Sequence, residues 1–176
     1  MGLDITAYSK LEILDPRILR AKERLFIPQD DPVYEFTDYH VNSPNNWMRD
    51  MKPGKYYETP DTETLDFRAG SYSGYNAYRK TISECFLGVT QNEVWNNEKQ
   101  YEGKPFYEQV NFSDCEGFIG PEVSAKLAKD YKEGRAQWYE YLRESGENQI
   151  EYYMSRYDLW TKAFELASDG GFVWFC

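Results

Sequence analysis

The chain has few of the residues from which metal sites and disulfides are usually built. It contains one histidine, His40, and three widely spaced cysteines, Cys85, Cys115 and Cys176. A zinc site needs closely spaced cysteine and histidine ligands, and a disulfide framework normally uses an even number of cysteines. We therefore expect reduced thiols, no cofactor and no metal. The only metal that this composition would suit is a hard cation held by carboxylates.

Basic residues and long apolar runs are also scarce. The chain has 20 Lys and Arg and 30 Asp and Glu, so its net charge is -10. This negative charge repels nucleic-acid phosphates and anionic lipid headgroups. No stretch approaches the roughly 20 apolar residues of a membrane span. Residues 1–8 resemble no secretory signal, because they lack a positively charged start and an apolar core. We expect no general DNA or RNA binding, no membrane association and a cytoplasmic location.

Aromatic residues, in contrast, are abundant. Sixteen Tyr, ten Phe and five Trp make up 18% of the 176 residues, which predicts a single compact domain over residues 1–176 with an aromatic core. Residues 28–66 differ from the rest, because they hold five of the eight prolines and nine acidic residues. We expect this segment to be an irregular, acidic, aromatic-rich excursion or lid with short strands.

The hydrophobic periodicity predicts both strands and helices. Alternation and short apolar runs predict strands at residues 3–7, 64–67, 106–110 and 172–175. Helical spacing predicts helices at residues 16–25, at 75–86 with a stop at Gly88, from 121 with a break at Gly134, and at 150–167. Because these elements do not alternate strictly, we expect an α+β domain with a small mixed or antiparallel sheet packed by about three to four helices.

The first candidate site is the segment from Arg68 to Gly74, between a predicted strand and a predicted helix. Small residues allow close approach of a ligand, while hydroxyls, free helix amides and an arginine favour an anion. Nearby tyrosines offer a base a stacking surface. The candidate ligand-binding residues are Arg68, Gly70, Ser71, Tyr72, Ser73, Tyr75 and Asn76. The alternative is structural: Ser73 caps the helix, the glycines form a turn and Arg68 pairs with an acid.

The second candidate site is the polar loop that begins at Asn111. Its candidate ligand-binding residues are Asn111, Ser113, Asp114 and Glu116, and three neighbouring apolar residues favour their burial. The carboxylates of Asp114 and Glu116 suit acid–base chemistry, a nucleotide-bound Mg²⁺, or the orientation of Arg68. The structural alternative is that this loop only satisfies backbone amides. Catalysis by Cys115 is disfavoured, because it needs His40 and a lowered thiol pKa.

Several long runs also occur in one order: MGLDITAY, FRAGSYSGYN, NFSDCEG followed by Ile119 and Gly120, and VSAKLAKD. Together they resemble a family of small phage and prophage proteins. The likeness covers most of the chain apart from residues 9–66 and 88–105. It implies a phage origin and an action in the host cytoplasm, and it brings no activity or residue roles with it.

Three functions agree with these features. The first is a phage counter-defence protein that sequesters a small anionic, nucleotide-like ligand at the two loops without turnover. The second is an acidic protein that inhibits a host defence protein through the segment from Asp30 to Asp66. The third is a small enzyme that acts on a nucleotide or glycosidic bond with Asp114 and Glu116 as its acid–base pair. The sequence leaves open whether the loops meet in space and whether the chain is a homo-oligomer.

Overall fold

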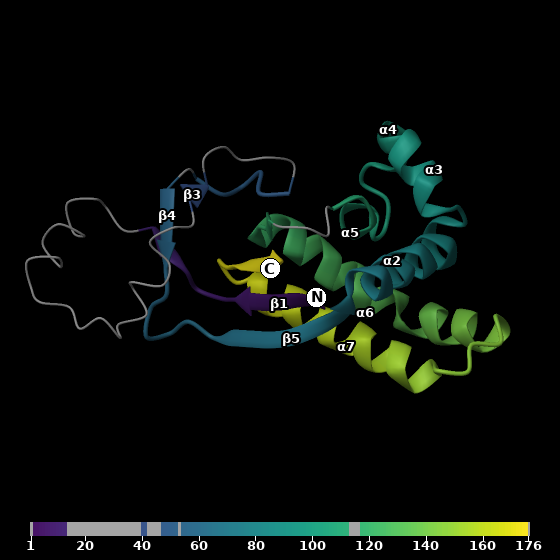
Figure 1. Cartoon of the computed structure of the whole chain (residues 1–176). Coiled ribbons are helices and arrows are strands. Elements are labelled where there is room, and N and C mark those ends of the chain that lie inside the picture. Colours follow the sequence, from purple (N-terminus) through teal and green to yellow (C-terminus); the bar gives the residue numbers. More distant parts are fainter. Residues whose placement is uncertain (1, 14–39, 42–46, 53, 113–116, 176) are drawn as a thin grey trace, which may run out of the picture.

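The computed structural model describes residues 2–13, 40–41, 47–52, 54–112 and 117–175 (Figure 1). These residues form a four-stranded antiparallel sheet, a second sheet of three short strands, and six helices. The predicted α+β class and antiparallel sheet are thereby confirmed. The helix predicted at residues 16–25 and most of the excursion predicted at 28–66 lie outside the described residues.

The main sheet has the strand order β5-β1-β7-β6. Its strands are β1 (Gly2–Tyr8), β5 (Thr64–Ser71), β6 (Gly117–Ile119) and β7 (Phe172–Phe175). As the alternation predicts, Leu3, Ile5 and Ala7 of β1 are fully buried. Because β1 pairs with both β5 and β7, the first strand of the chain lies inside the sheet.

Because neighbouring strands of this sheet are antiparallel, the start of one strand lies beside the end of the next. The start of β1, the end of β5, the start of β6 and the end of β7 point toward the same end of the sheet, where Gly2 pairs with Ser71. We call this the Ser71 end. Phe175 and its partner Gly117 stop three residues short of that pair, because Phe175 pairs with Ile5. Tyr8 pairs with both Thr64 and Phe172 at the opposite end, which leads into Lys10 and which we call the Lys10 end.

Three long and three short helices pack beside the sheet (Figure 1). They are α2 (Tyr72–Leu87), α3 (Gln91–Asn96), α4 (Glu98–Tyr101), α5 (Tyr107–Asn111), α6 (Pro121–Glu144) and α7 (Ile150–Ala167). Trp160 of α7 packs against both the sheet and α2. The centre of its indole ring lies 5.1 Å from the ring centre of Phe67, 5.5 Å from that of Tyr75 and 5.6 Å from that of Phe175. The core is therefore aromatic, as predicted. No helix in the described part of the chain is long and apolar enough to cross a membrane.

Two elements differ from the prediction at the candidate loops. Residues 68–74 are not a turn, since β5 continues to Ser71 and α2 begins at the next residue. Residues 106–110 are not a strand, because Tyr107–Asn111 form α5. Phe106 starts this helix from a left-handed backbone conformation with φ of 59°, and its N–H donates to Asp130 Oδ2 at 2.9 Å. A contact with α6, distant in sequence, thus overrides the local strand pattern.

The third difference is at Gly134, where the predicted break does not occur. Helix α6 runs without interruption from Pro121 to Glu144. A Cβ on Gly134 would lie 2.7 Å from Phe86 Cε1 and 2.9 Å from Tyr157 Oη. The glycine therefore makes room for two side chains that pack against α6, and its low helix propensity is outweighed by the rest of a long helix.

The second sheet and its neighbours cover part of the main sheet's other face. It consists of β2 (Glu12–Ile13), β3 (His40–Val41) and β4 (Gly54–Tyr57), with β4 in the middle. A second buried cluster contains Tyr8, Leu11, Met48, Met51, Tyr56 and Phe172. Strands β3 and β4 are the short strands expected within residues 28–66.

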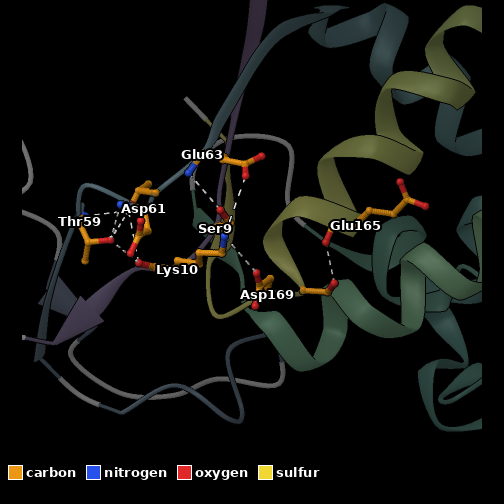
Figure 2. A network of polar contacts seen from close by, with 9 residues as sticks. Ser9, Lys10, Thr59, Asp61, Glu63, Glu165 and Asp169 are labelled. Atoms are coloured by element: carbon orange, nitrogen blue, oxygen red, sulfur yellow. Dashed lines mark hydrogen bonds and ion pairs between the residues drawn. The ribbon is translucent and has the colours of Figure 1, made fainter.

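Backbone contacts around Lys10 hold the Lys10 end together (Figure 2). Lys10 has a left-handed φ of 51°, its N–H donates to the Asp169 carbonyl at 2.7 Å, and its own carbonyl accepts from the hydroxyls of Thr59 and Thr62. Its Nζ lies 4.0 Å from carboxylate oxygens of both Glu63 and Asp169. At this end of the sheet, the charges are paired with one another.

Candidate functional site

The borders of the two predicted loops face the same end of the sheet. Phe112 and Gly117, which precede and follow the four residues of the second loop that are not described, both contact Phe175. The Phe112 and Phe175 rings lie 4.6 Å apart, and Gly117 pairs with Phe175 in the sheet. The first predicted loop ends at the same end of the sheet, because Ser71 pairs with Gly2. Ser113, Asp114 and Glu116 themselves lie outside the described residues.

Arg68 extends its guanidinium along the sheet toward this end. It lies across from Asp4 in β1, and its side chain is exposed. A Cβ on Gly2 would lie 1.9 Å from Arg68 Nη2, so the guanidinium rests on the Gly2 backbone and depends on the absence of a side chain there. Because Gly2 pairs with Ser71, Arg68 approaches the residue that caps α2.

No described carboxylate forms an ion pair with Arg68. Three other arginines of the described chain do have such partners: Arg49 pairs with Glu122, Arg135 with Asp158, and Arg143 with Glu140. The structural alternative, in which Arg68 pairs with an acid, is therefore not what the described residues show. An exposed arginine without a carboxylate partner is available to an anionic ligand.

The start of α2 is built around two hydroxyls. Ser71 is the N-cap, and its Oγ accepts from the Gly74 N–H at 3.0 Å and lies 3.0 Å from Ser73 Oγ. The helix cap is thus Ser71 and not Ser73. The first turn of α2 contains no acidic residue, so its N-terminal dipole is not neutralised by a side chain of that turn. Gly70 precedes the cap with φ of 124°, a conformation that favours glycine.

The tyrosines of the first candidate site differ in their exposure. Tyr75 is fully buried, and its ring packs against Trp160 and Phe175. The expectation that Tyr75 offers a ligand a stacking surface is therefore corrected: its helical position turns it into the core. Tyr72 is half-buried.

Arg79 connects α2 to the beginning of the second loop. Its side chain is only 3% exposed, its Nη2 donates to Asn76 Oδ1 at 3.1 Å, and its Nη1 donates to the carbonyl of Phe112. Its guanidinium carbon also lies 4.9 Å from the centre of the Tyr75 ring. Sequence reasoning counted Arg79 only as local charge. Its spacing of four residues from the core residue Tyr75 was the available signal that it lies on the buried side of α2.

A buried chain of hydrogen bonds holds helix α5, which ends at Asn111 and leads into Phe112. Tyr131 donates its hydroxyl to Gln109 Oε1 at 2.6 Å, and the Tyr78 and Tyr131 hydroxyls lie 3.2 Å apart. Burial raises the pKa values of Tyr78 and Tyr131 well above that of an exposed tyrosine, so both stay neutral. Asn111 is half-buried and donates to the Tyr107 hydroxyl at 3.1 Å.

An ion cluster fixes α5 to α6 from the other side. Lys126 Nζ lies 2.6 Å from Glu108 Oε2 and 2.8 Å from Asp130 Oδ2, and it donates to the Lys104 carbonyl at 2.8 Å. The Glu108 side chain is buried, so its charge depends on Lys126. These contacts hold the backbone that leads into the second loop.

A second arginine reaches the edge of β5 from α7. Arg156 Nη1 donates to the Arg68 carbonyl, and its guanidinium carbon lies 5.1 Å from the centre of the Tyr152 ring. The Tyr152 hydroxyl lies 3.9 Å from where a Cβ on Gly70 would be. Arg156, like Arg68, has no described carboxylate as an ion-pair partner.

No protein-family model matches the chain, and neither a curated protein nor a solved structure does. The described residues also contain no group of three or more His, Cys, Asp or Glu side chains placed to hold a metal ion. The chemistry of the site therefore depends on the side chains already described.

A cavity at the Lys10 end offers a useful contrast. It measures about 370 Å³ and is lined by Ser9, Glu63, Lys162, Glu165, Leu166 and Asp169. Glu63 and Asp169 face Lys10, and Glu165 pairs with Lys132 at 2.7 Å. Since these carboxylates already face lysines, the Ser71 end is the better candidate for recognition of a charged ligand.

Proposed function

We propose that this protein binds and sequesters a small anionic, nucleotide-like ligand at the Ser71 end, without turnover. The observation that supports the proposal best is the position of Arg68. Its exposed guanidinium lies over Gly2 at the Ser71 end of the sheet, and it has no ion-pair partner among the described carboxylates. An arginine in this situation binds a phosphate or carboxylate with two parallel hydrogen bonds.

The surroundings of Arg68 favour one small anion over a long polyanion. The hydroxyls of Ser71 and Ser73 and the unneutralised start of α2 add hydrogen-bond donors and a favourable dipole. Arg156 adds a second cation beside the same strand. The net charge of -10, in contrast, repels an extended phosphate backbone.

The biological role follows from the resemblance to small phage and prophage proteins. We propose that the protein acts in the host cytoplasm, where removal of a signalling nucleotide would blunt a host defence. A binder serves this role without catalysis, provided that it is present in excess over the signal.

Isothermal titration calorimetry with a panel of cyclic and ADP-ribose-type nucleotides tests the proposal. We expect heat from at least one of them with the unmodified protein and with Arg143→Ala, and a large loss of affinity with Arg68→Ala. Arg143 is a matched control, because it is an exposed arginine paired with Glu140 in another part of the fold. No heat from any nucleotide, or normal binding by Arg68→Ala, would refute the assignment.

Chromatography of the nucleotide after incubation separates sequestration from the enzymatic alternative. We expect the nucleotide to be recovered unchanged. A product that forms with the protein and disappears with Glu116→Gln, while folding is intact, would instead establish the small enzyme.

A further inference from the structure

An exposed indole lies next to the candidate site, on the short helix that packs against α2 and α5. Trp95 of α3 is 40% exposed, which is unusual for so large an apolar side chain. Its ring centre lies 5.9 Å from the guanidinium carbon of Arg79, the residue that binds both Asn76 and the carbonyl of Phe112. Trp95 is therefore part of the group of residues that borders the second loop.

The indole is held in one orientation. Its Nε1–H donates to the carbonyl of Val110 at 3.1 Å, and the preceding residue, Val94, is fully buried. A ring that is already fixed loses little conformational entropy when a ligand stacks on it. This distinguishes Trp95 from an aromatic side chain that is merely exposed.

A fixed amide accompanies the fixed ring. The side chain of Asn76 is exposed, and its Oδ1 accepts from Arg79 Nη2 at 3.1 Å, which leaves the Nδ2 hydrogens to donate elsewhere. The rise of an α-helix places Asn76 about 7 Å along α2 from Ser71. An anion held at Arg68 and Ser71 therefore lies one to two helical turns from Asn76.

We propose that Trp95 and Asn76 form a base-recognition subsite, in which an aromatic base stacks on the exposed indole and accepts a hydrogen bond from Asn76 Nδ2. This inference rests on the proposed function and makes it more specific, because it requires a nucleotide rather than a phosphosugar or another small anion. Arg68 binds the anionic group, and Arg79 holds Asn76 in place as a positioning residue.

The test compares two probes by calorimetry: the nucleotide that binds most tightly in the panel above, and inorganic pyrophosphate, which has no base. Loss of one base–aromatic stack should weaken the nucleotide about tenfold to a hundredfold in Trp95→Ala. Pyrophosphate affinity should stay the same in this variant. Trp95→Phe, which keeps a ring, should retain most of the nucleotide affinity.

Tyr139→Ala is the matched control for removal of an exposed aromatic ring, because Tyr139 is 45% exposed on α6. It should leave both affinities unchanged. Stacking should also quench tryptophan fluorescence in the unmodified protein, and this quenching should be lost in Trp95→Phe.

The outcomes separate the two proposals. If nucleotide binding depends on Arg68 while Trp95→Ala binds the nucleotide normally, the base subsite is wrong and the proposed function stands. If no nucleotide of the panel binds, both are wrong. Equal weakening of nucleotide and pyrophosphate by Trp95→Ala would show that the indole only supports the fold, and would also overturn the subsite.

Discussion

Replacement of Gly134 by alanine tests how closely Phe86 and Tyr157 pack against α6. On an open helix surface, alanine stabilises a helix over glycine by about 1 kcal/mol. At Gly134, the added Cβ would lie 2.7 Å from Phe86 Cε1 and 2.9 Å from Tyr157 Oη, closer than ordinary van der Waals contact. Overpacking of this kind costs about 1–3 kcal/mol. The steric effect should therefore outweigh the helix propensity.

Phe86 and Tyr157 are both held in place by other contacts. The Phe86 ring stacks on Phe106 with 4.1 Å between ring centres, and the Tyr157 hydroxyl donates to the carbonyl of Tyr131 at 2.7 Å. We expect Gly134→Ala to lower the free energy of unfolding by about 1 kcal/mol net, which corresponds to a melting temperature about 2–4 °C lower for a chain of this size. Urea titration and thermal unfolding followed by circular dichroism measure both quantities.

The Phe86→Leu background provides the control, because the shorter side chain removes the nearest ring atoms. In that background, Gly134→Ala should cost less than in the unmodified protein, since only Tyr157 Oη still opposes the new Cβ, and the double-mutant cycle should give a favourable coupling energy. If Gly134→Ala instead stabilises the unmodified protein by about 1 kcal/mol, the close approach of Phe86 and Tyr157 is wrong.

Three other contacts also give measurable effects when one partner is changed. Gly171→Ala should destabilise the fold by about 3 kcal/mol or more, because the new Cβ would lie 1.7 Å from the backbone oxygen of Tyr8, and a urea titration that shows near-normal stability would contradict this. Lys126→Ala should cost about 3 kcal/mol, since it leaves the buried Glu108 charge without its partner, and Lys129→Ala is the exposed control. Burial raises the pKa of the Cys85 thiol to about 12, so a variant with Cys85 as its only cysteine should react with iodoacetamide at pH 8 on the order of a thousandfold more slowly when folded than when unfolded. The reaction of the folded protein should become faster as the pH rises, and similar rates in the two states would refute the prediction.

Strands and helices with a clear period could be predicted from the sequence because the pattern itself reports burial. Leu3, Ile5 and Ala7 alternate and are buried in β1, and the apolar stripe of residues 150–167 coincides with α7. Gly88 ends α2 with φ of 69°, as a glycine after an apolar stripe predicts. In these elements, local sequence and tertiary environment agree.

The remaining errors lie where a distant residue decides the local structure. The strand pattern of residues 106–110 gives way to α5 because Asp130 of α6 accepts the Phe106 N–H. Gly134 does not break α6, since its role is to admit Phe86 and Tyr157. No local pattern contains such partners, and so the sequence alone could not supply them.

The candidate site was predictable in part for the same reason. The residue types at Arg68, Ser71 and Ser73 indicated an anion site, and the start of α2 was foreseeable within a few residues. The contacts of Arg79 and Trp95 near the second loop could not be predicted, because their relation to Phe112 and Val110 depends on how α2, α3 and α5 pack together. Tyr75 was misjudged because the face of α2 that enters the core was not yet known.

The position of β1 inside the sheet has a consequence for how the chain folds during synthesis. β1 pairs with β5 on one side and with β7 on the other, and residues 9–171 separate it from β7. During synthesis, the edge of β1 that pairs with β7 stays open until residues 172–175 have left the ribosome. Pairing across such a distance is slow, and an open apolar strand invites aggregation. Yield in cells should therefore depend on how quickly residues 172–175 follow β1 and on chaperones that cover β1 until then.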